Sequence, residues 1–323
     1  MQTYDIAVIG GGAGGLVVAS VAAQLGLKVA LVEKEQQLGG DCLHYGCVPS
    51  KSLLRSAKVA HMVRHAGDYG INVSHADTDM KQVNTYIRNA VDTIQQHDSH
   101  QRFREIGCHI YTGGAQFVNK HCIRIDDIEL RAKRFVIASG SSAWIPDIDG
   151  IESTGYLTTE DLFSLEALPE HLLILGAGPV GVEMAQAYAR LGSRVTLIEQ
   201  AQRILPRFDP DISQVLKRQF ESDGISVVQG AVNRVQQQGD IRTVVLDDGR
   251  ELSGDQLLLA IGRRPVVNEL CLEKAGVEFS EKGIVVNARM QTSRRHIFAC
   301  GDVTGLMPFT HVAEQQAGIV IAN

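Results

Sequence analysis

Cys42 and Cys47 are the one pair of cysteines that lie close together in this 323-residue sequence, within the stretch GGDCLHYGCVPSK. Their spacing differs from that of zinc sites, which use Cys-x-x-Cys pairs or Cys and His partners repeated farther along the chain. Two thiols near a helix N-terminus can close a small disulfide ring if the first turn is distorted, and the helix dipole there stabilises a thiolate. The spacing therefore argues against a zinc site and leaves a redox-active pair and two structural thiols as the open alternatives.

A nucleotide-binding device precedes this pair. Gly10, Gly12 and Gly15 follow a short apolar run and fit G-x-G-x-x-G, and Glu33 ends the next apolar run. The first glycine makes the turn, the second lets the backbone approach a pyrophosphate, and the third lets the helix pack on the strand. The phosphate then lies at the helix N-terminus, and Glu33 can accept hydrogen bonds from ribose hydroxyls.

The same device occurs a second time in HLLILGAGPVGVEMAQAYARLGSRVTLIEQ. Here Gly176, Gly178 and Gly181 carry the pattern, and Glu199 lies 23 residues after Gly176, the same interval that separates Glu33 from Gly10. One such pattern is weak, but two complete units of equal span indicate two dinucleotide-binding folds rather than structural glycine turns.

The residue at the end of the second device bears on the choice of cofactor. Glu199 favours NAD, because an acid there bonds the free ribose hydroxyls and repels a 2′-phosphate. Arg203 lies close enough in sequence to keep NADP as the alternative.

Composition and sequence pattern argue against some classes of partner. The net charge is -6 with 21% charged residues, so nucleic acid is not predicted as a partner. Glycines and polar residues interrupt the apolar run from Ile6 to Ala30, which favours a strand, turn and helix over a membrane span. The N-terminus has no basic region followed by a cleavage site, so a cytoplasmic location is expected.

Taken together, these residues resemble the class I pyridine nucleotide-disulfide oxidoreductases, the family of dihydrolipoamide dehydrogenase and mercuric reductase-like proteins. The resemblance runs from Tyr4 to the end of the chain. Its most specific element is the active-site pattern G-G-x-C-x-x-x-x-G-C-x-P-S-K, which is matched here by Gly39, Gly40, Cys42, Gly46, Cys47, Pro49, Ser50 and Lys51. The stretches FVIASGSSAWIP, LLLAIGRRPVVN and HIFACGDVTG are similar to its looser motifs.

The resemblance implies a role for each matching residue. Cys42 would be the interchange thiol that attacks the substrate, Cys47 the thiol beside the flavin, and Lys51 a buried flavin-side lysine paired with Glu183. The FAD-binding residues would be Gly10, Gly12, Gly15, Glu33, Gly40, Ala115, Ser139, Gly140 and Asp302. The NAD-binding residues would be Gly176, Gly178, Gly181, Glu199, Gly262 and Arg263.

The implied fold is α/β, with two Rossmann-like dinucleotide-binding domains and the NAD(P) domain inserted into the FAD domain. The FAD domain would comprise residues 1–147 and 267–323, and the NAD(P) domain residues 148–266. Family members continue with a C-terminal interface domain that carries a His–Glu pair and forms the homodimer. Because the chain stops soon after HIFACGDVTG, we expect that domain to be absent and this chain not to be fully active.

The implied activity is electron transfer between NAD(H), FAD and the Cys42–Cys47 disulfide, acting on a small-molecule or protein-bound disulfide or dithiol, as in dihydrolipoamide dehydrogenase. One alternative is a mercuric reductase-like metal reductase, since thiolates are good ligands for soft metals. A second is an FAD- and NAD-binding redox sensor that reduces no substrate. Small thioredoxin reductases have a similar length, but their Cys-x-x-Cys pair in the nicotinamide domain has no counterpart here.

Overall fold

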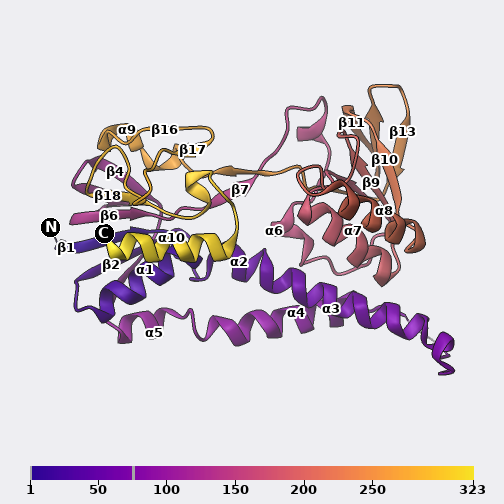
Figure 1. The fold of residues 1–323 in the computed structure, drawn as a ribbon, viewed down its shortest axis with the longest axis horizontal. Coiled ribbons are helices and arrows are strands. Elements are labelled where there is room, and N and C mark those ends of the chain that lie inside the picture. Colours follow the sequence, from indigo (N-terminus) through magenta and orange to yellow (C-terminus); the bar gives the residue numbers. More distant parts are fainter. Residues whose placement is uncertain (1, 75–76) are drawn as a thin grey trace. The chain divides into compact units, whose positions relative to one another are not determined.

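The computed structural model describes residues 2–74 and 77–323 and divides the chain into two compact units. Unit 1 comprises Met1–His44, Val91–Ser142 and Arg263–Asn323, and unit 2 comprises Tyr45–Ala90 and Ala143–Gly262. Both combine parallel sheet with helices, so the predicted α/β class with two Rossmann-type folds is confirmed (Figure 1). Residues 45–90 pack with unit 2, although the sequence placed them in the first domain; the cofactor-domain boundaries stay a prediction.

Unit 1 is built on a seven-stranded sheet in the order β3-β2-β1-β6-β5-β4, with β18 pairing with β6. Strands β1, β2, β3, β6 and β18 pair in parallel, whereas β5 pairs antiparallel with both β4 and β6. These strands are β1 (Gln2–Ile9), β2 (Val29–Glu33), β3 (Cys108–Thr112), β4 (Ala115–Asn119), β5 (Cys122–Ile125), β6 (Ile128–Ile137) and β18 (Ile297–Ala299).

Both faces of this sheet are covered, since its strands carry apolar side chains on both. Along β1, Ile6 and Val8 face the core that α1 and α10 complete, while Ala7 and Ile9 face a second core on the other side. Helices α1 and α10 lie side by side (Figure 1). The remaining elements assigned to unit 1 are α1 (Ala13–Gln24), α2 (Gly40–His44), α5 (His100–Glu105), β15 (Arg263–Pro265), η3 (Asn268–Leu270), α9 (Leu272–Ala275), β16 (Phe279–Ser280), β17 (Gly283–Ile284), η4 (Asp302–Thr304) and α10 (Thr310–Ala322).

Unit 2 contains a four-stranded parallel sheet, β10-β9-β8-β14, and a three-stranded antiparallel sheet, β11-β12-β13. Along β8, Leu172 and Ile174 face the core shared with α7, and Leu173 and Leu175 face the core shared with the antiparallel sheet. The strands are β8 (His171–Leu175), β9 (Arg194–Glu199), β10 (Ser226–Gln229), β11 (Val232–Gln238), β12 (Ile241–Leu246), β13 (Glu251–Gly254) and β14 (Gln256–Leu259).

The longest helix of unit 2, α3, begins at the second cysteine of the predicted redox pair and packs against α7. The helices of this unit are α3 (Cys47–Arg64), η1 (Ala66–Tyr69), η2 (Ile151–Ser153), α6 (Thr159–Leu162), α7 (Pro179–Leu191) and α8 (Pro210–Ser222). Helix α4 (Met80–Gln95) and strand β7 (Ser141–Ala143) each contain residues of both units. The carboxyl ends of the parallel strands in each unit carry the glycine turns, which places the candidate sites there.

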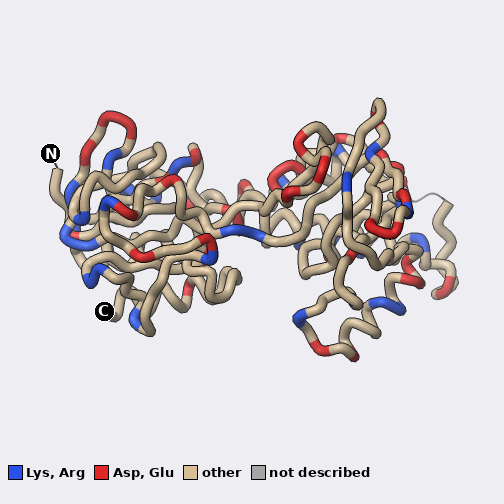
Figure 2. The backbone as a smooth tube through the Cα atoms, turned by 90° about the horizontal axis from the view of Figure 1, so that it is seen from above, with Lys and Arg blue, Asp and Glu red and all other residues tan. Residues whose placement is uncertain are grey.

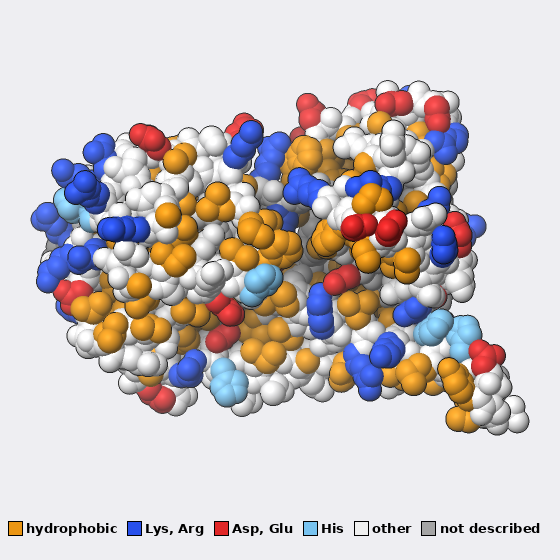
Figure 3. All heavy atoms as spheres, viewed as in Figure 1, with side chains coloured by type: hydrophobic (Ala, Val, Ile, Leu, Met, Phe, Trp, Pro, Cys, Tyr) orange, Lys and Arg blue, Asp and Glu red, His pale blue; other side chains and the backbone are white. Residues whose placement is uncertain are grey.

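Charged residues of both signs are interspersed along both units (Figure 2), and hydrophobic side chains are spread over the face drawn in Figure 3. Among the described residues, no helix is both long and apolar enough to cross a membrane.

Candidate functional site

The first glycine turn, between β1 and α1, has no room for side chains at two of its three glycines. A Cβ on Gly10 would lie 2.2 Å from the carbonyl oxygen of Ala138, and one on Gly15 would lie 1.9 Å from the oxygen of Gly10. Around Gly12 the nearest atom to such a Cβ is the Cα of Gly40, at 3.7 Å. Gly10 and Gly15 therefore serve close packing, while Gly12 keeps a side chain away from the start of α1.

Glu33, at the end of β2, is oriented by backbone donors. Its carboxylate accepts hydrogen bonds from the Gly11 N–H at 2.5 Å and the Glu35 N–H at 2.9 Å, and only 7% of the residue is exposed. Each carboxylate oxygen has a second lone pair, so both can accept a further donor. The carboxylate is thus held at the glycine turn with the capacity to accept ribose hydroxyls.

The second turn, between β8 and α7, repeats this arrangement. A Cβ on Gly176 would lie 2.6 Å from the carbonyl oxygen of Ala260, and one on Gly181 would lie 1.9 Å from the oxygen of Gly176. No atom lies within 4 Å of a Cβ placed on Gly178. The equal sequence spacing of the two devices therefore corresponds to a similar local geometry.

The acid of the second turn is also oriented by the backbone. Glu199 accepts hydrogen bonds from the N–H groups of Ala177 at 2.7 Å and Ala201 at 2.9 Å. Arg203 instead donates to the carbonyl oxygens of Pro206 and Phe208, at 3.0 and 3.1 Å. Loop carbonyls therefore hold the Arg203 guanidinium, the feature on which the NADP alternative depended.

Both turns fit a dinucleotide phosphate. Helices α1 and α7 begin at Gly12 and Gly178 as N-caps, with no side-chain cap and no acidic residue in the first turn. The backbone N–H groups there and the positive end of each helix dipole are suited to an anion, and the glycines let it approach closely. The residues present could hold FAD and a nicotinamide dinucleotide.

The predicted redox segment starts next to the first glycine turn. Gly40 has a φ of +61°, and a Cβ there would lie 2.6 Å from the Cα of Gly12. Cys42 lies in α2 and is half-buried, whereas Cys47 is the exposed first residue of α3. The Gly40–Gly12 contact therefore brings α2, and with it Cys42, to the predicted phosphate turn.

His44, between the two cysteines, is half-buried rather than a solvated turn residue. Its Nε2 lies 3.0 Å from the carbonyl oxygen of Leu38. Because a carbonyl can only accept, Nε2 carries the proton of that hydrogen bond. Gln95 donates to the same oxygen at 3.0 Å, so two side chains anchor the loop that precedes the redox segment.

Lys51 and Glu183 form the ion pair that the resemblance implied. The Lys51 Nζ lies 2.8 Å from both carboxylate oxygens of Glu183, joining α3 to α7 within unit 2. The expected burial of Lys51 is wrong, because 60% of its side chain is exposed. An exposed pair of this kind contributes little to stability, so its value lies in fixing the position of the Lys51 ammonium group.

Arg263 joins a network that the sequence did not predict. Its Nη2 lies 2.8 Å from the Asp41 carboxylate, and its Nε donates to the Ser141 hydroxyl at 2.8 Å. That hydroxyl donates to the Asp302 carboxylate at 2.6 Å. All four residues belong to unit 1. The structure thus links Arg263 through Ser141 to Asp302, a predicted FAD residue, while its NAD role stays a prediction.

The network also affects the Asp41 carboxyl. Burial raises the pKa of this carboxyl, while the charge of Arg263 and its hydrogen bond oppose the shift. Asp41 and Ser141 could have been suspected only from their neighbours, Cys42 and the predicted Gly140.

Four further residues with predicted cofactor roles lie outside the two glycine turns and the redox segment. Ser139 donates to the Val266 carbonyl at 2.8 Å, and Gly140 accepts from the Val266 N–H at 3.0 Å. Gly262 accepts from the Trp144 N–H at 3.0 Å. Ala115 is buried at the start of β4. These contacts are structural, and the cofactor roles of all four residues stay predictions.

Burial separates the cysteines into two groups. It raises the pKa of the Cys108 thiol to about 11 and that of Cys300 to about 12, and it also raises the pKa of Cys122. At pH 8 a thiol of pKa 11 is ionised in only about one molecule in a thousand, and the thiolate is the reactive form.

Alkylation of the reduced native chain at pH 8 is therefore expected to label the three more accessible cysteines, Cys42, Cys47 and Cys271. Cys108, Cys122 and Cys300 should react only after unfolding. Peptide mapping by mass spectrometry checks this, and native labelling of Cys300 as fast as Cys47 would contradict the described core.

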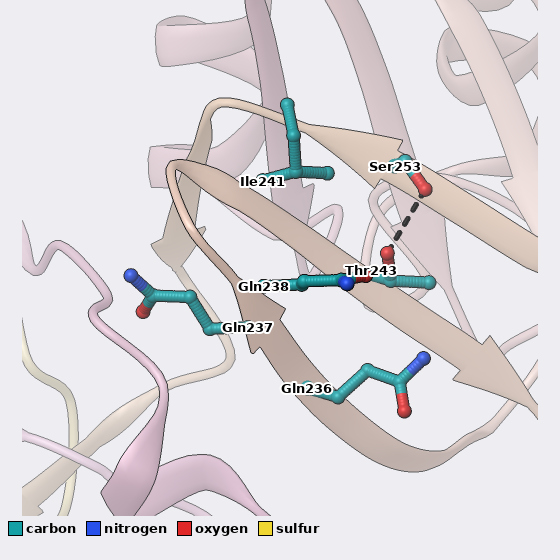
Figure 4. A pocket seen from close by; sticks show the side chains of 6 residues that line it. All are labelled: Gln236, Gln237, Gln238, Ile241, Thr243 and Ser253. Carbon is teal, nitrogen blue, oxygen red and sulfur yellow. Dashed lines mark hydrogen bonds between the residues drawn. The ribbon is translucent and has the colours of Figure 1, made fainter.

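A cavity of about 700 Å³ lies on the antiparallel sheet of unit 2, away from the predicted residues. Polar side chains dominate it, and Gln237 points away from Gln236 and Gln238 (Figure 4). The Thr243 and Ser253 hydroxyls bond each other at 3.0 Å. Its lining is Gln236, Gln237, Gln238, Ile241, Thr243 and Ser253, none of which carries a charge.

One chain therefore carries two glycine turns, each with an oriented acid, and a cysteine segment between them. The family model described as pyridine nucleotide-disulphide oxidoreductase matches residues 4–317. The chain belongs to this family. The family pairs a flavin with a nicotinamide cofactor, so the predicted relationship and cofactor classes are confirmed.

Two similar proteins carry different names. A mercuric reductase from Bacillus cereus is 34% identical over 99% of this chain and 51% of its own length. A dihydrolipoyl dehydrogenase from Bacillus subtilis is 36% identical over 98% of this chain and 70% of its own length. The chain spans about half the length of the first of these.

Among solved structures, the Cu(II) complex of the HOCl-induced flavoprotein disulfide reductase RclA from Escherichia coli is similar with a TM-score of 0.89. The identity is 30%, over 99% of this chain and 70% of that protein. The likeness therefore covers both units of the chain.

Proposed function

We propose that the protein is a flavoprotein oxidoreductase that passes electrons from NADH through FAD to a Cys42–Cys47 disulfide, and from there to a disulfide substrate. The observation that carries this proposal is the Lys51–Glu183 ion pair. It joins the helix that starts with Cys47 to the helix that starts at the second glycine turn. Within unit 1, Gly40 contacts Gly12 of the first predicted nucleotide turn, and within unit 2, Lys51 pairs with Glu183 on the helix that follows the second.

When bound, FAD supplies the ring that accepts a hydride and passes on an electron pair. Two electrons and two protons would convert the Cys42–Cys47 disulfide to two thiols. Cys42, as thiolate, then attacks one sulfur of the substrate disulfide and releases the other as a thiol. Cys47 attacks the mixed disulfide at Cys42, which releases the second substrate thiol and restores the pair. NADH and one proton are consumed for every disulfide converted to two thiols.

Lys51 supports this role through its charge. A cation near a flavin favours the negatively charged reduced ring, and Glu183 holds the ammonium group at a defined position on α3. The substrate proposed is a small-molecule or protein-bound disulfide or dithiol, and dihydrolipoamide oxidation would be the reverse reaction. The homodimer stays a prediction.

For the nicotinamide side we propose NAD rather than NADP. Backbone donors aim the Glu199 carboxylate at the second glycine turn, where it would repel a 2′-phosphate, and Arg203 is engaged by loop carbonyls. An anaerobic titration of the FAD-loaded chain is therefore expected to show flavin reduction by NADH at lower concentrations than by NADPH.

The same titration tests the thiol pair. A long-wavelength absorption band after two electrons indicates a thiolate beside the flavin, whereas bleaching without that band would contradict the disulfide reductase proposal. Equal response to NADPH would contradict the role of Glu199 alone. A Glu199→Gln chain keeps an acceptor but loses the charge, so it should use NADPH better than the parent.

A second candidate is reduction of a metal ion held by the thiols. Relatives named mercuric reductase and a similar structure described as a Cu(II) complex favour it. Two thiolates from Cys42 and Cys47 are suitable ligands for a soft ion. NADH oxidation that depends on Hg²⁺ and not on lipoamide or another disulfide would favour this candidate.

A further inference from the structure

The network around Arg263 has a charge balance that the proposed electron path does not explain. One guanidinium stands between two carboxylates: Nη2 meets Asp41 at 2.8 Å, and Nε reaches Asp302 through the Ser141 hydroxyl. Nη2 also donates to the Ser141 carbonyl at 2.7 Å, which fixes the plane of the guanidinium. Only 23% of the Arg263 side chain is exposed. Such a fork of donors is specific to arginine.

The network lies beside the first glycine turn. Asp41 follows Gly40, whose Cα position is set by the close approach to Gly12 at the N-terminus of α1. Asp302 begins η4 and follows Gly301, whose N–H donates to the buried Gln316 side chain at 2.7 Å. Two acids are therefore held at the end of unit 1 where the phosphates of a dinucleotide would bind. A pyrophosphate adds further negative charge, and Arg263 is the cation that these two acids share.

We propose that Arg263 is a positioning residue of the flavin side, which neutralises Asp41 and Asp302 together so that a dinucleotide pyrophosphate can bind at the first glycine turn. The inference rests on the proposed function for the identity of the cofactor as FAD. It reassigns Arg263, which the sequence placed in the NAD site. It also gives Asp41, the neighbour of Cys42, a role that is electrostatic rather than catalytic.

Substitutions of Arg263 and of Asp41 are therefore expected to have opposite effects on FAD affinity. Arg263→Gln leaves two uncompensated carboxylates, so the FAD dissociation constant should rise by at least about tenfold. Asp41→Asn removes one negative charge and leaves the Arg263–Ser141 bonds in place, so FAD should bind as tightly as before or more tightly. The double variant should bind FAD better than Arg263→Gln alone.

The measurement is the FAD dissociation constant, from flavin fluorescence on dilution of the FAD-loaded chain, with NAD⁺ affinity measured in parallel. Arg264→Gln is the matched control, because it changes the net charge equally at the next, exposed residue. It should leave FAD affinity unchanged. Arg263→Lys keeps the charge without the fork and should recover part of the loss.

Two results would overturn the inference. If Asp41→Asn weakens FAD binding as much as Arg263→Gln does, the pair is only a structural ion pair. If Arg263→Gln weakens NAD⁺ and not FAD, the residue belongs to the nicotinamide site. Should Arg263→Gln fail to fold, Asp41→Asn still decides: weaker FAD binding would overturn the inference, and unchanged or tighter FAD binding would support it. None of these readouts needs disulfide turnover, so the proposed function can fail separately.

Discussion

An FAD-loaded Cys42→Ser chain is expected to keep flavin reduction by NADH and to lose disulfide reduction by at least about a thousandfold, as removal of an attacking nucleophile does. The reason is the division of roles between the thiols. Cys42, half-buried in α2, would attack the substrate, while Cys47, at the start of α3, would take electrons from the flavin. Stopped-flow spectroscopy of flavin reduction and a single-turnover assay with a small disulfide measure the two steps separately.

Cys271→Ser provides the control, because it makes the same chemical change at a half-buried cysteine outside the redox segment. Both steps should persist in that chain. Equal loss of flavin reduction and disulfide exchange in Cys42→Ser would refute the division of roles. If the parent chain reduces its flavin but no disulfide and no metal ion, the protein acts as the redox sensor that the sequence left open.

Gly181→Ala is expected to lower the free energy of unfolding by about 3 kcal/mol or more, because overpacking against the backbone cannot be relieved by moving a side chain. The added Cβ would lie 1.9 Å from the carbonyl oxygen of Gly176, where α7 crosses the end of β8. Chemical denaturation followed by circular dichroism measures the loss.

Gly178→Ala is the matched variant three residues away. No atom lies within 4 Å of its Cβ, and its φ of -73° suits alanine, so stability should be nearly unchanged. The methyl group would instead stand at the N-terminus of α7, where a pyrophosphate approaches the backbone. NAD⁺ affinity, measured by calorimetry, should therefore fall by at least about tenfold. Retained affinity would show that the turn does not bind the dinucleotide.

The local parts of this protein were predictable because their causes are local. A turn that must exclude Cβ atoms requires glycine at set intervals, so the spacing of Gly10, Gly15, Gly176 and Gly181 is enough to identify both nucleotide folds. The redox segment is equally local. The Lys51–Glu183 pair followed from the family pattern, since neither residue alone differs from an ordinary surface charge.

Long-range contacts decided the rest. The sequence by itself determined the α/β class, the two glycine turns with their acids, and the cysteine segment between them. Only the tertiary structure showed that residues 45–90 pack with unit 2, that Lys51 is exposed, and that Arg263 meets Asp41 and Asp302. Arg263 lies 222 residues from Asp41 along the chain, and no local spacing encodes such a contact. It arises because β15 re-enters unit 1 beside α2 and η4, a consequence of packing rather than of pattern.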